Sequence, residues 1–162
     1  MTLAEFTTPG LIVPHLTGRD ATSAIHELSL ALQRAGCVSD WLQFYHAALT
    51  REFLLSTDLA AGVAFPHARS TSVRRLAFAF GRVDPPFLWS PKIPQPAHLV
   101  FLVAVPASDS AHYLPLLAGL ARLAGLAALR ETIQHAPDFL QILAAFEQID
   151  LPGTTAAAPL IS

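Results

Sequence analysis

Apolar residues recur every three or four positions in the first third of the chain, and this spacing predicts two amphipathic helices. The first begins after Asp20, whose carboxylate can cap it, and ends at Gly36. The second begins near Ser39 or Asp40 and leads the chain to Arg51. The apolar positions of the first are Ala24, Ile25, Leu28, Ala31, Leu32 and Ala35, and those of the second are Leu42, Tyr45, Ala48 and Leu49.

Short continuous apolar runs follow and predict strands at Val63 to Phe65, Leu76 to Val83 and Leu99 to Val105. The last run has no polar interruption, so we expect a central strand that is covered on both faces. Segment 84–96 is rich in proline, which lacks the N–H that a sheet ladder requires. We therefore expect a loop or a broken edge hairpin there.

Two further helical patterns lie in the last third of the chain. One opens at Asp109 or Ser110 and stops near Gly125, and the other covers Pro137 to about Glu147. The order of elements predicts an α/β sandwich without internal repeats, in which helices cover a sheet. We expect one domain over residues 1–151, followed by a tail at 152–162 whose small residues predict mobility.

Composition narrows the class of protein. The chain has 162 residues, of which 52% are hydrophobic and 14% charged, enough for one sizeable core. The net charge of −2, with dispersed lysines and arginines, argues against nucleic acid as a partner. The longest apolar run, Leu99 to Pro106, is far shorter than the ~20 residues of a membrane helix. The absence of a secretory signal at the N-terminus and the single cysteine, Cys37, favour the cytoplasm.

Histidine carries the candidate chemistry. The sequence has no CxxC pair, no HExxH motif and no Walker or dinucleotide glycine pattern, which leaves seven histidines. His67 ends the stretch Gly62-Val63-Ala64-Phe65-Pro66-His67, where Pro66 restricts the backbone on both sides of itself. Such a histidine is either an aimed nucleophile or a strand-end residue bonded to backbone. Motifs elsewhere in the chain favour one of these two interpretations of His67.

An ordered set of motifs resembles the fructose and mannitol type (type 2) enzyme IIA domain of the bacterial phosphotransferase system, including its nitrogen-regulatory relatives. The family has an Arg-Glu pair, a Ser-Thr pair, a glycine turn and an apolar-Pro-His sequence. It then has a tryptophan loop, an apolar strand that ends in proline, and a histidine that opens a helix. The matching residues are Arg51-Glu52, Ser56-Thr57, Gly62, Phe65-Pro66-His67, Trp89, Leu99 to Pro106, and His112.

The resemblance implies a fold and a set of roles. The fold is a central mixed β-sheet flanked by helices on both faces. His67 would accept a phosphoryl group from an HPr-like phosphocarrier protein and pass it to an enzyme IIB for sugar uptake. Arg51 would balance the phosphoryl charge, and His112 would hydrogen-bond the phosphoryl oxygens or orient the His67 ring. Ser56, Thr57 and Pro66 would support the site.

Physical chemistry agrees with these roles. An unperturbed imidazole titrates near ~6.5, so a neutral His67 has a lone pair without a separate base. Phosphoryl transfer mainly needs alignment and donors for three equatorial oxygens. We therefore expect a phosphohistidine intermediate with neither cofactor nor metal. A zinc site from His46, His67 and His112 is the alternative, although the close ligand spacing typical of zinc is missing.

Other functions remain open at this stage. The chain lacks a glycine that commonly follows the Ser-Thr pair in this family, and Asp58 adds a negative charge there. A non-phosphorylated binding module is therefore an alternative, as is a regulatory domain whose phosphorylation controls transporters or kinases. The sequence does not identify the sugar, the enzyme IIB partner or the oligomeric state.

Overall fold

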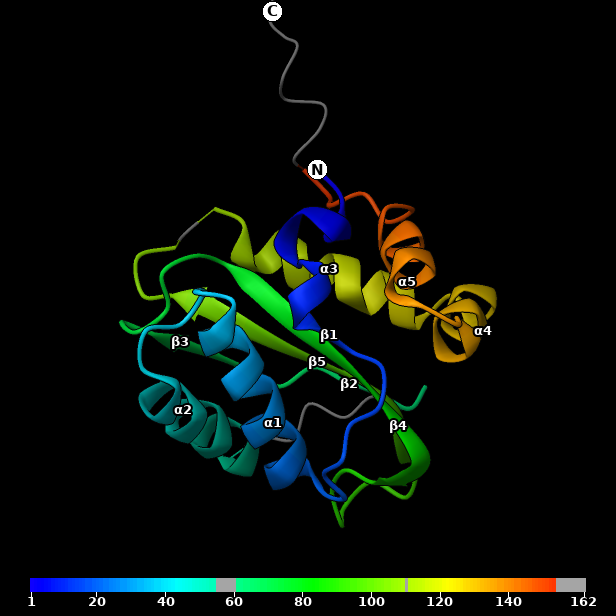
Figure 1. The fold of residues 1–162 in the computed structure, drawn as a ribbon, viewed down its shortest axis with the longest axis horizontal. Helices are drawn as coiled ribbons and strands as arrows, with labels where there is room; N and C mark the ends of the chain where they lie inside the picture. The colour runs from blue at the N-terminus through cyan, green and yellow to red at the C-terminus, as the bar shows by residue number, and fades with distance from the viewer. Residues whose placement is uncertain (55–60, 110, 154–162) are drawn as a thin grey trace, which may run out of the picture.

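The computed structural model describes residues 1–54, 61–109 and 111–153, which form a five-stranded sheet between two layers of helices (Figure 1). Helices α1 and α2 cover one face of the sheet, and α3, α4 and α5 cover the other (Figure 1). The helices on both faces confirm the predicted α/β sandwich. The elements are the short 3-10 helices Leu3–Phe6 and Pro9–Leu11, β1 Ile12–Val13, α1 Ala21–Arg34, α2 Trp41–Leu54, β2 Val63–Ala64, β3 His67–Ser70, β4 Ala77–Leu88, β5 Pro96–Pro106, α3 Tyr113–Ala124, α4 Ala127–His135 and α5 Phe139–Phe146.

The sheet is mixed, as predicted. Its order is β1-β4-β5-β2, and β3 also pairs with β5 beyond the end of β2. Strand β4 is antiparallel to β5, whereas β1 is parallel to β4 and both β2 and β3 are parallel to β5. Every residue of β5 from Leu99 to Val105 is at most 1% exposed, which confirms the central strand covered on both faces.

Alternation along the strands divides the core into two halves. Phe101 and Val103 of β5 belong to the cluster beneath α3, α4 and α5, whereas Val100 and Leu102 belong to the cluster beneath α1 and α2. The same alternation in β3 decides which layer each side chain of the His67 segment faces.

The first two predicted helices are confirmed, together with their caps. Asp20 accepts a hydrogen bond from the backbone N–H of Ser23 at 2.8 Å, and Asp40 accepts one from that of Gln43 at 3.2 Å. Gly36, which follows α1, adopts a φ of 79°, a conformation that glycine reaches without steric cost.

The last third of the chain differs from its prediction. Helix α3 begins at Tyr113, later than Asp109 or Ser110, and α4 was not expected. Only Leu129 and Ile133 of α4 are buried, too few positions for a clear periodic signal. No single helix in the described ranges is long and apolar enough to cross a membrane; α3 and α4 qualify only as a pair, bent by 88° at the break between them.

Segment 84–96 forms the end of a hairpin. Strand β4 continues to Leu88 and pairs with the start of β5, and the pairing register shifts between Arg82 and Phe87, around the two prolines. This confirms the broken hairpin. Strand β1, of two residues, is too short to give a pattern and was missed. Residues 154–162, most of the predicted tail, lie outside the described residues, so the boundary at 151 stays a prediction.

Candidate functional site

The His67 segment consists of two short strands with a break between them. Strands β2 and β3 both run parallel to β5, and Phe65 and Pro66 separate them. The carbonyl of Pro66 accepts a hydrogen bond from the backbone N–H of Val103 at 2.9 Å, so the break stays attached to the central strand. His67 is the first residue of β3 and lies opposite Val103. The sequence placed His67 at the end of the strand Val63 to Phe65; in the structure it instead begins a separate strand, β3, which was not predicted.

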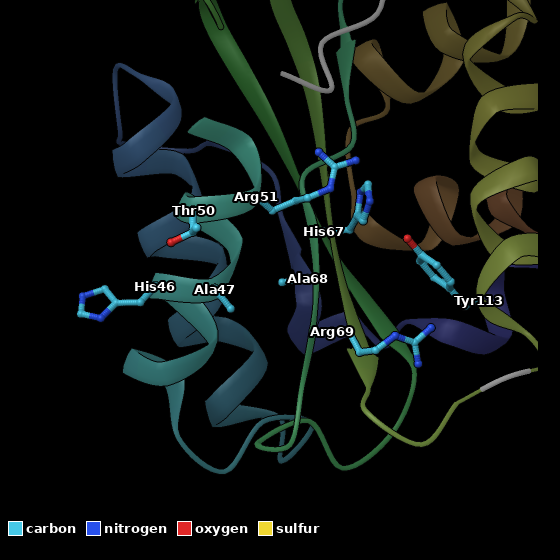
Figure 2. A pocket seen from close by; sticks show the side chains of 8 residues that line it. All are labelled: His46, Ala47, Thr50, Arg51, His67, Ala68, Arg69 and Tyr113. Carbon is cyan, nitrogen blue, oxygen red and sulfur yellow. The ribbon is translucent and has the colours of Figure 1, made fainter. Parts of the chain in front are cut away.

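A cavity of about 530 Å³ opens beside His67, between α2 and the start of α3. His67 and Arg69 extend from β3 toward α3, whereas Ala68 between them points toward α2 (Figure 2). This is the alternation expected of a strand. The residues that line the cavity are His46, Ala47, Thr50, Arg51, His67, Ala68, Arg69 and Tyr113.

The backbone holds the His67 ring in one tautomer. Nδ1 lies 2.9 Å from the carbonyl oxygen of Phe65, and because a carbonyl can only accept, Nδ1 must carry the hydrogen. In the neutral ring the lone pair is then on Nε2. Burial lowers the pKa of His67, the hydrogen bond to Phe65 opposes this shift, and the positive charge of Arg51 adds to it. The net lowering of the pKa favours the neutral ring, whose lone pair is on Nε2.

Arg51 comes from the last turn of α2 and extends toward His67 (Figure 2). Its guanidinium is close enough to lower the pKa of His67, after the larger effect of burial. The next residue, Glu52, accepts a hydrogen bond from the indole N–H of Trp89 at 3.0 Å, which joins the end of α2 to the end of the hairpin. Arg51 and His67, predicted from separate motifs, therefore share one cavity.

His112 does not line this cavity. It precedes the first turn of α3, and its ring lies 6.4 Å from the ring of Phe6, measured between centroids. The next residue, Tyr113, occupies the position beside His67, with ring centroids 5.9 Å apart. Successive residues at a helix start point in different directions, about 100° apart. Tyr113, and not His112, is therefore the residue from the start of α3 that lines the cavity, and the role of His112 stays a prediction.

Arg69, to which the sequence analysis gave no role, makes several contacts in the structure. Its Nη1 donates to the carbonyl oxygens of Pro106 at 3.1 Å, Ala107 at 3.3 Å and Asp109 at 2.6 Å. Its guanidinium carbon also lies 5.3 Å from the centroid of the Tyr113 ring. Arg69 therefore fastens the segment after β5 to β3 and holds Tyr113 next to the cavity.

The remaining predicted site residues are distributed as follows. Pro66 is buried at the strand break, while Ser56, Thr57 and Asp58 lie outside the described residues. His46 lines the cavity, but its ring points away from His67 (Figure 2). In the described part of the chain no group of three or more histidine, cysteine, aspartate or glutamate side chains could hold a metal ion, so the zinc alternative gains no support.

Residues 5–149 match the family described as "Phosphoenolpyruvate-dependent sugar phosphotransferase system, EIIA 2". The chain belongs to this family. The resemblance inferred from the motifs is therefore confirmed, and the EIIA domain occupies nearly all of the chain.

The curated relatives of this EIIA domain include both sugar-specific and regulatory proteins. The fructose-specific EIIABC component of Bacillus subtilis is 32% identical over 76% of this chain, which spans only 19% of that protein. A nitrogen regulatory protein of Bradyrhizobium diazoefficiens is 28% identical over 97% of this chain and 100% of its own length. The EIIA domain thus spans about a fifth of its multidomain relatives and the whole of a regulatory one.

Solved structures share the fold. The nitrogen regulatory protein IIA-Ntr of Neisseria meningitidis superimposes with a TM-score of 0.75 at 26% identity, covering 88% of this chain and 97% of that one. The IIA mannitol of Escherichia coli superimposes with a TM-score of 0.74 at 18% identity, covering 86% of this chain and 97% of that one. The second likeness concerns the fold alone, and it confirms the mannitol-type sandwich.

Proposed function

We propose that this EIIA domain is a phosphoryl carrier of the phosphotransferase system. Nε2 of His67 accepts a phosphoryl group from an HPr-like phosphocarrier protein and passes it to an enzyme IIB of a sugar uptake system. The observation that carries the proposal is the hydrogen bond from Nδ1 to Phe65, because it leaves the lone pair of Nε2 in an open cavity beside Arg51. The lowered pKa of His67, caused mainly by burial, keeps this lone pair available.

The transfer needs no proton movement at His67. The bond between phosphorus and the carrier's leaving atom breaks as the bond between phosphorus and Nε2 forms. The ring then has the phosphoryl group on Nε2 and the hydrogen on Nδ1, and the carbonyl of Phe65 stabilises the positive charge that develops on the ring. Arg51 supplies a fixed charge and a planar set of donors for the phosphoryl oxygens. Transfer to enzyme IIB is the reverse of this step with another acceptor.

An exposed apolar surface adjoins the cavity and suits a protein partner. Phe53 and Leu54, at the end of α2, are 93% and 80% exposed. Together with Leu49 and Thr50 they line a shallow hollow, and Thr50 also lines the His67 cavity. Exposed large apolar side chains next to a reactive group favour transient docking of another protein. We propose that the phosphocarrier and enzyme IIB bind in turn to this apolar surface, in the cytoplasm.

A regulatory function is the second candidate. It is favoured by the full-length similarity to the nitrogen regulatory protein of Bradyrhizobium diazoefficiens. In that case phosphorylation of His67 would control binding to a transporter or kinase, and no sugar would receive the phosphate. Both candidate functions use the same acceptor nitrogen. They differ only in the protein that phosphorylated His67 acts on, which is either an enzyme IIB that receives the phosphate or a transporter or kinase that is regulated.

One experiment tests both candidates. The EIIA domain is incubated with enzyme I, HPr and labelled phosphoenolpyruvate, and enzyme IIB is added in a second step. We expect acid-labile label on His67 that is transferred to enzyme IIB. Stable label that no enzyme IIB of the same organism removes would favour the regulatory candidate. A wild-type chain that acquires no label would overturn both and favour a binding module.

A further inference from the structure

Tyr113 is the residue of α3 that reaches the His67 cavity in the described part of the chain. Its ring centroid lies 5.9 Å from that of His67, with 53° between the ring planes. Its hydroxyl points toward His67, and Arg51 approaches His67 from another side (Figure 2). The space next to the His67 ring therefore lies between a guanidinium and a phenol.

Two contacts fix the position of Tyr113. Its backbone N–H donates to Oδ2 of Asp109 at 3.1 Å, which holds the start of α3. The guanidinium of Arg69 lies over its ring at 5.3 Å and is itself bonded to the carbonyls of Pro106, Ala107 and Asp109. Neither contact uses the hydroxyl. The side chain is thus held through its backbone and its ring, and its polar end stays available.

The hydroxyl of Tyr113 makes no hydrogen bond to another protein atom within the described ranges. A phenol hydroxyl can donate one hydrogen bond. A donor without a protein partner that points toward the His67 ring is suited to an anion bound to that ring.

We propose that Tyr113 is a catalytic residue of the phosphoryl transfer at His67, where its hydroxyl donates a hydrogen bond to an equatorial phosphoryl oxygen. The proposal rests on the proposed function. Tyr113 and Arg51 approach the phosphoryl group from different sides, and both stabilise the charge that spreads over its oxygens in the transition state. The hydroxyl keeps its hydrogen throughout the step, since it donates a hydrogen bond and transfers no proton.

The role assigned here to Tyr113 is the one that the family resemblance implies for His112. The ring of His112 lies beside Phe6 and not in the cavity. The two assignments lead to opposite results for two neighbouring substitutions. Tyr113→Phe removes the hydroxyl and keeps the ring under Arg69, whereas His112→Ala removes the imidazole and keeps Tyr113.

The test measures the rate of His67 phosphorylation with two donors. One is the labelled HPr-like phosphocarrier, and the other is phosphoramidate, a small phosphoryl donor that needs no protein docking. We expect Tyr113→Phe to slow both reactions about 10- to 100-fold, the effect of one hydrogen bond to a charged group. His112→Ala and Tyr45→Phe, the latter removing the only other tyrosine hydroxyl in the chain, are expected to stay within twofold of wild type.

Each other outcome has a definite meaning. A Tyr113→Phe variant that matches wild type with both donors overturns the role of Tyr113, and a slow His112→Ala beside a normal Tyr113→Phe returns the role to His112. A Tyr113→Phe variant that is slow with the phosphocarrier only, and normal with phosphoramidate, also overturns it, since the hydroxyl then serves docking. If phosphoramidate labels the wild type and the phosphocarrier does not, the carrier function is overturned. The phosphoramidate rates of wild type and Tyr113→Phe then still decide the role of Tyr113. A wild type that neither donor labels overturns both.

Discussion

The cavity around His67 and a second cavity near the start of β5 contain the same kinds of side chain. The second cavity has a volume of about 360 Å³ and lies between β5 and α4. It is lined by two histidines and one arginine, and the first cavity is lined by two histidines and two arginines. By residue type, either could receive a phosphoryl group. The polar and charged residues of the second cavity are His98, Arg130, Glu131, Gln134 and His135.

Hydrogen bonding separates the two cavities. In the first, Nδ1 of His67 donates to a carbonyl, which leaves the lone pair on Nε2. In the second, Nδ1 of His98 lies 3.1 Å from the amide nitrogen of Gln134, which can only donate. Nδ1 of His98 therefore accepts, and the hydrogen of the neutral ring is on Nε2. The two rings are held in opposite tautomers.

The two cavities also differ in whether their other polar groups have partners within the protein. Nε2 of His135 lies 3.2 Å from the carboxylate of Glu131, and Arg130 donates to the carbonyl of Ala124. Around His67, by contrast, the Tyr113 hydroxyl is a fixed donor with no protein acceptor within the described ranges. A histidine and an arginine in one cavity are therefore insufficient; the partner of each ring nitrogen decides whether a nucleophile is present.

The largest expected effect is the loss of the acceptor itself. His67→Ala should abolish acid-labile label from the phosphocarrier, because no other ring in the cavity offers Nε2 to the phosphoryl group. His98→Ala is the matched control and should keep full labelling. Label that persists in His67→Ala and disappears in His98→Ala would reverse the comparison of the two cavities.

A smaller effect is expected from the arginines. Arg51→Gln should slow phosphorylation of His67 roughly 100-fold, the usual result of removing one group that stabilises transition-state charge. Arg130→Gln, in the second cavity, should change the rate less than twofold. The measurement is the initial rate of labelling at saturating phosphocarrier. Equal rates for the two variants would show that Arg51 does not act on the phosphoryl group.

Gly62 precedes β2 and lies against His98 of the second cavity, and it offers a test of stability. It has a φ of 79°, and a Cβ added there would lie 2.8 Å from Cδ2 of His98. Gly62→Ala should lower the free energy of unfolding by about 1–3 kcal/mol, measured by urea denaturation. In a double-mutant cycle, His98→Ala should recover part of this loss because it removes the ring. Strict additivity of the two substitutions would argue against the contact.

The smallest expected effect is on the titration of His67. Its pKa should lie below the ordinary histidine value because of burial, and Arg51 contributes to the shift. Arg51→Gln removes a positive neighbour and should raise this pKa, whereas Glu52→Gln removes a negative neighbour and should lower it. NMR titration of the imidazole checks both directions, and shifts of the same sign would contradict the electrostatic account.

The same shift has a consequence for stability. Because the pKa of His67 is lower in the folded chain, the unfolded chain takes up the proton first as the pH falls. The contribution of neutral His67 to stability is therefore complete above the ordinary histidine range, and it is lost as the pH falls through the folded pKa. His67→Gln should weaken this acid sensitivity, measured as the change in unfolding free energy with pH.

Much of the fold follows from local patterns in the sequence. Helices α1 and α2 were predicted because their apolar spacing and the caps at Asp20 and Asp40 agree. Strand β5 was predicted because a continuous apolar run is stable only when both of its faces are covered. Helix α4 and strands β1 and β3 were missed. Two buried positions in α4 and two residues in β1 are too few to define a period, and β3 has only four residues, of which two are charged or titratable.

The sequence by itself determined that His67 would be presented by a rigid proline at a strand end, since that constraint lies within neighbouring residues. The sequence also indicated the family, because the motifs that are typical of the family occur along the chain in the same order. Only the tertiary structure decided which nitrogen of His67 is free and that Tyr113, rather than His112, faces it. The reason is geometric: at a helix start, one residue changes the direction of a side chain, and that start depends on Asp109 and Arg69, which join segments far apart in the chain.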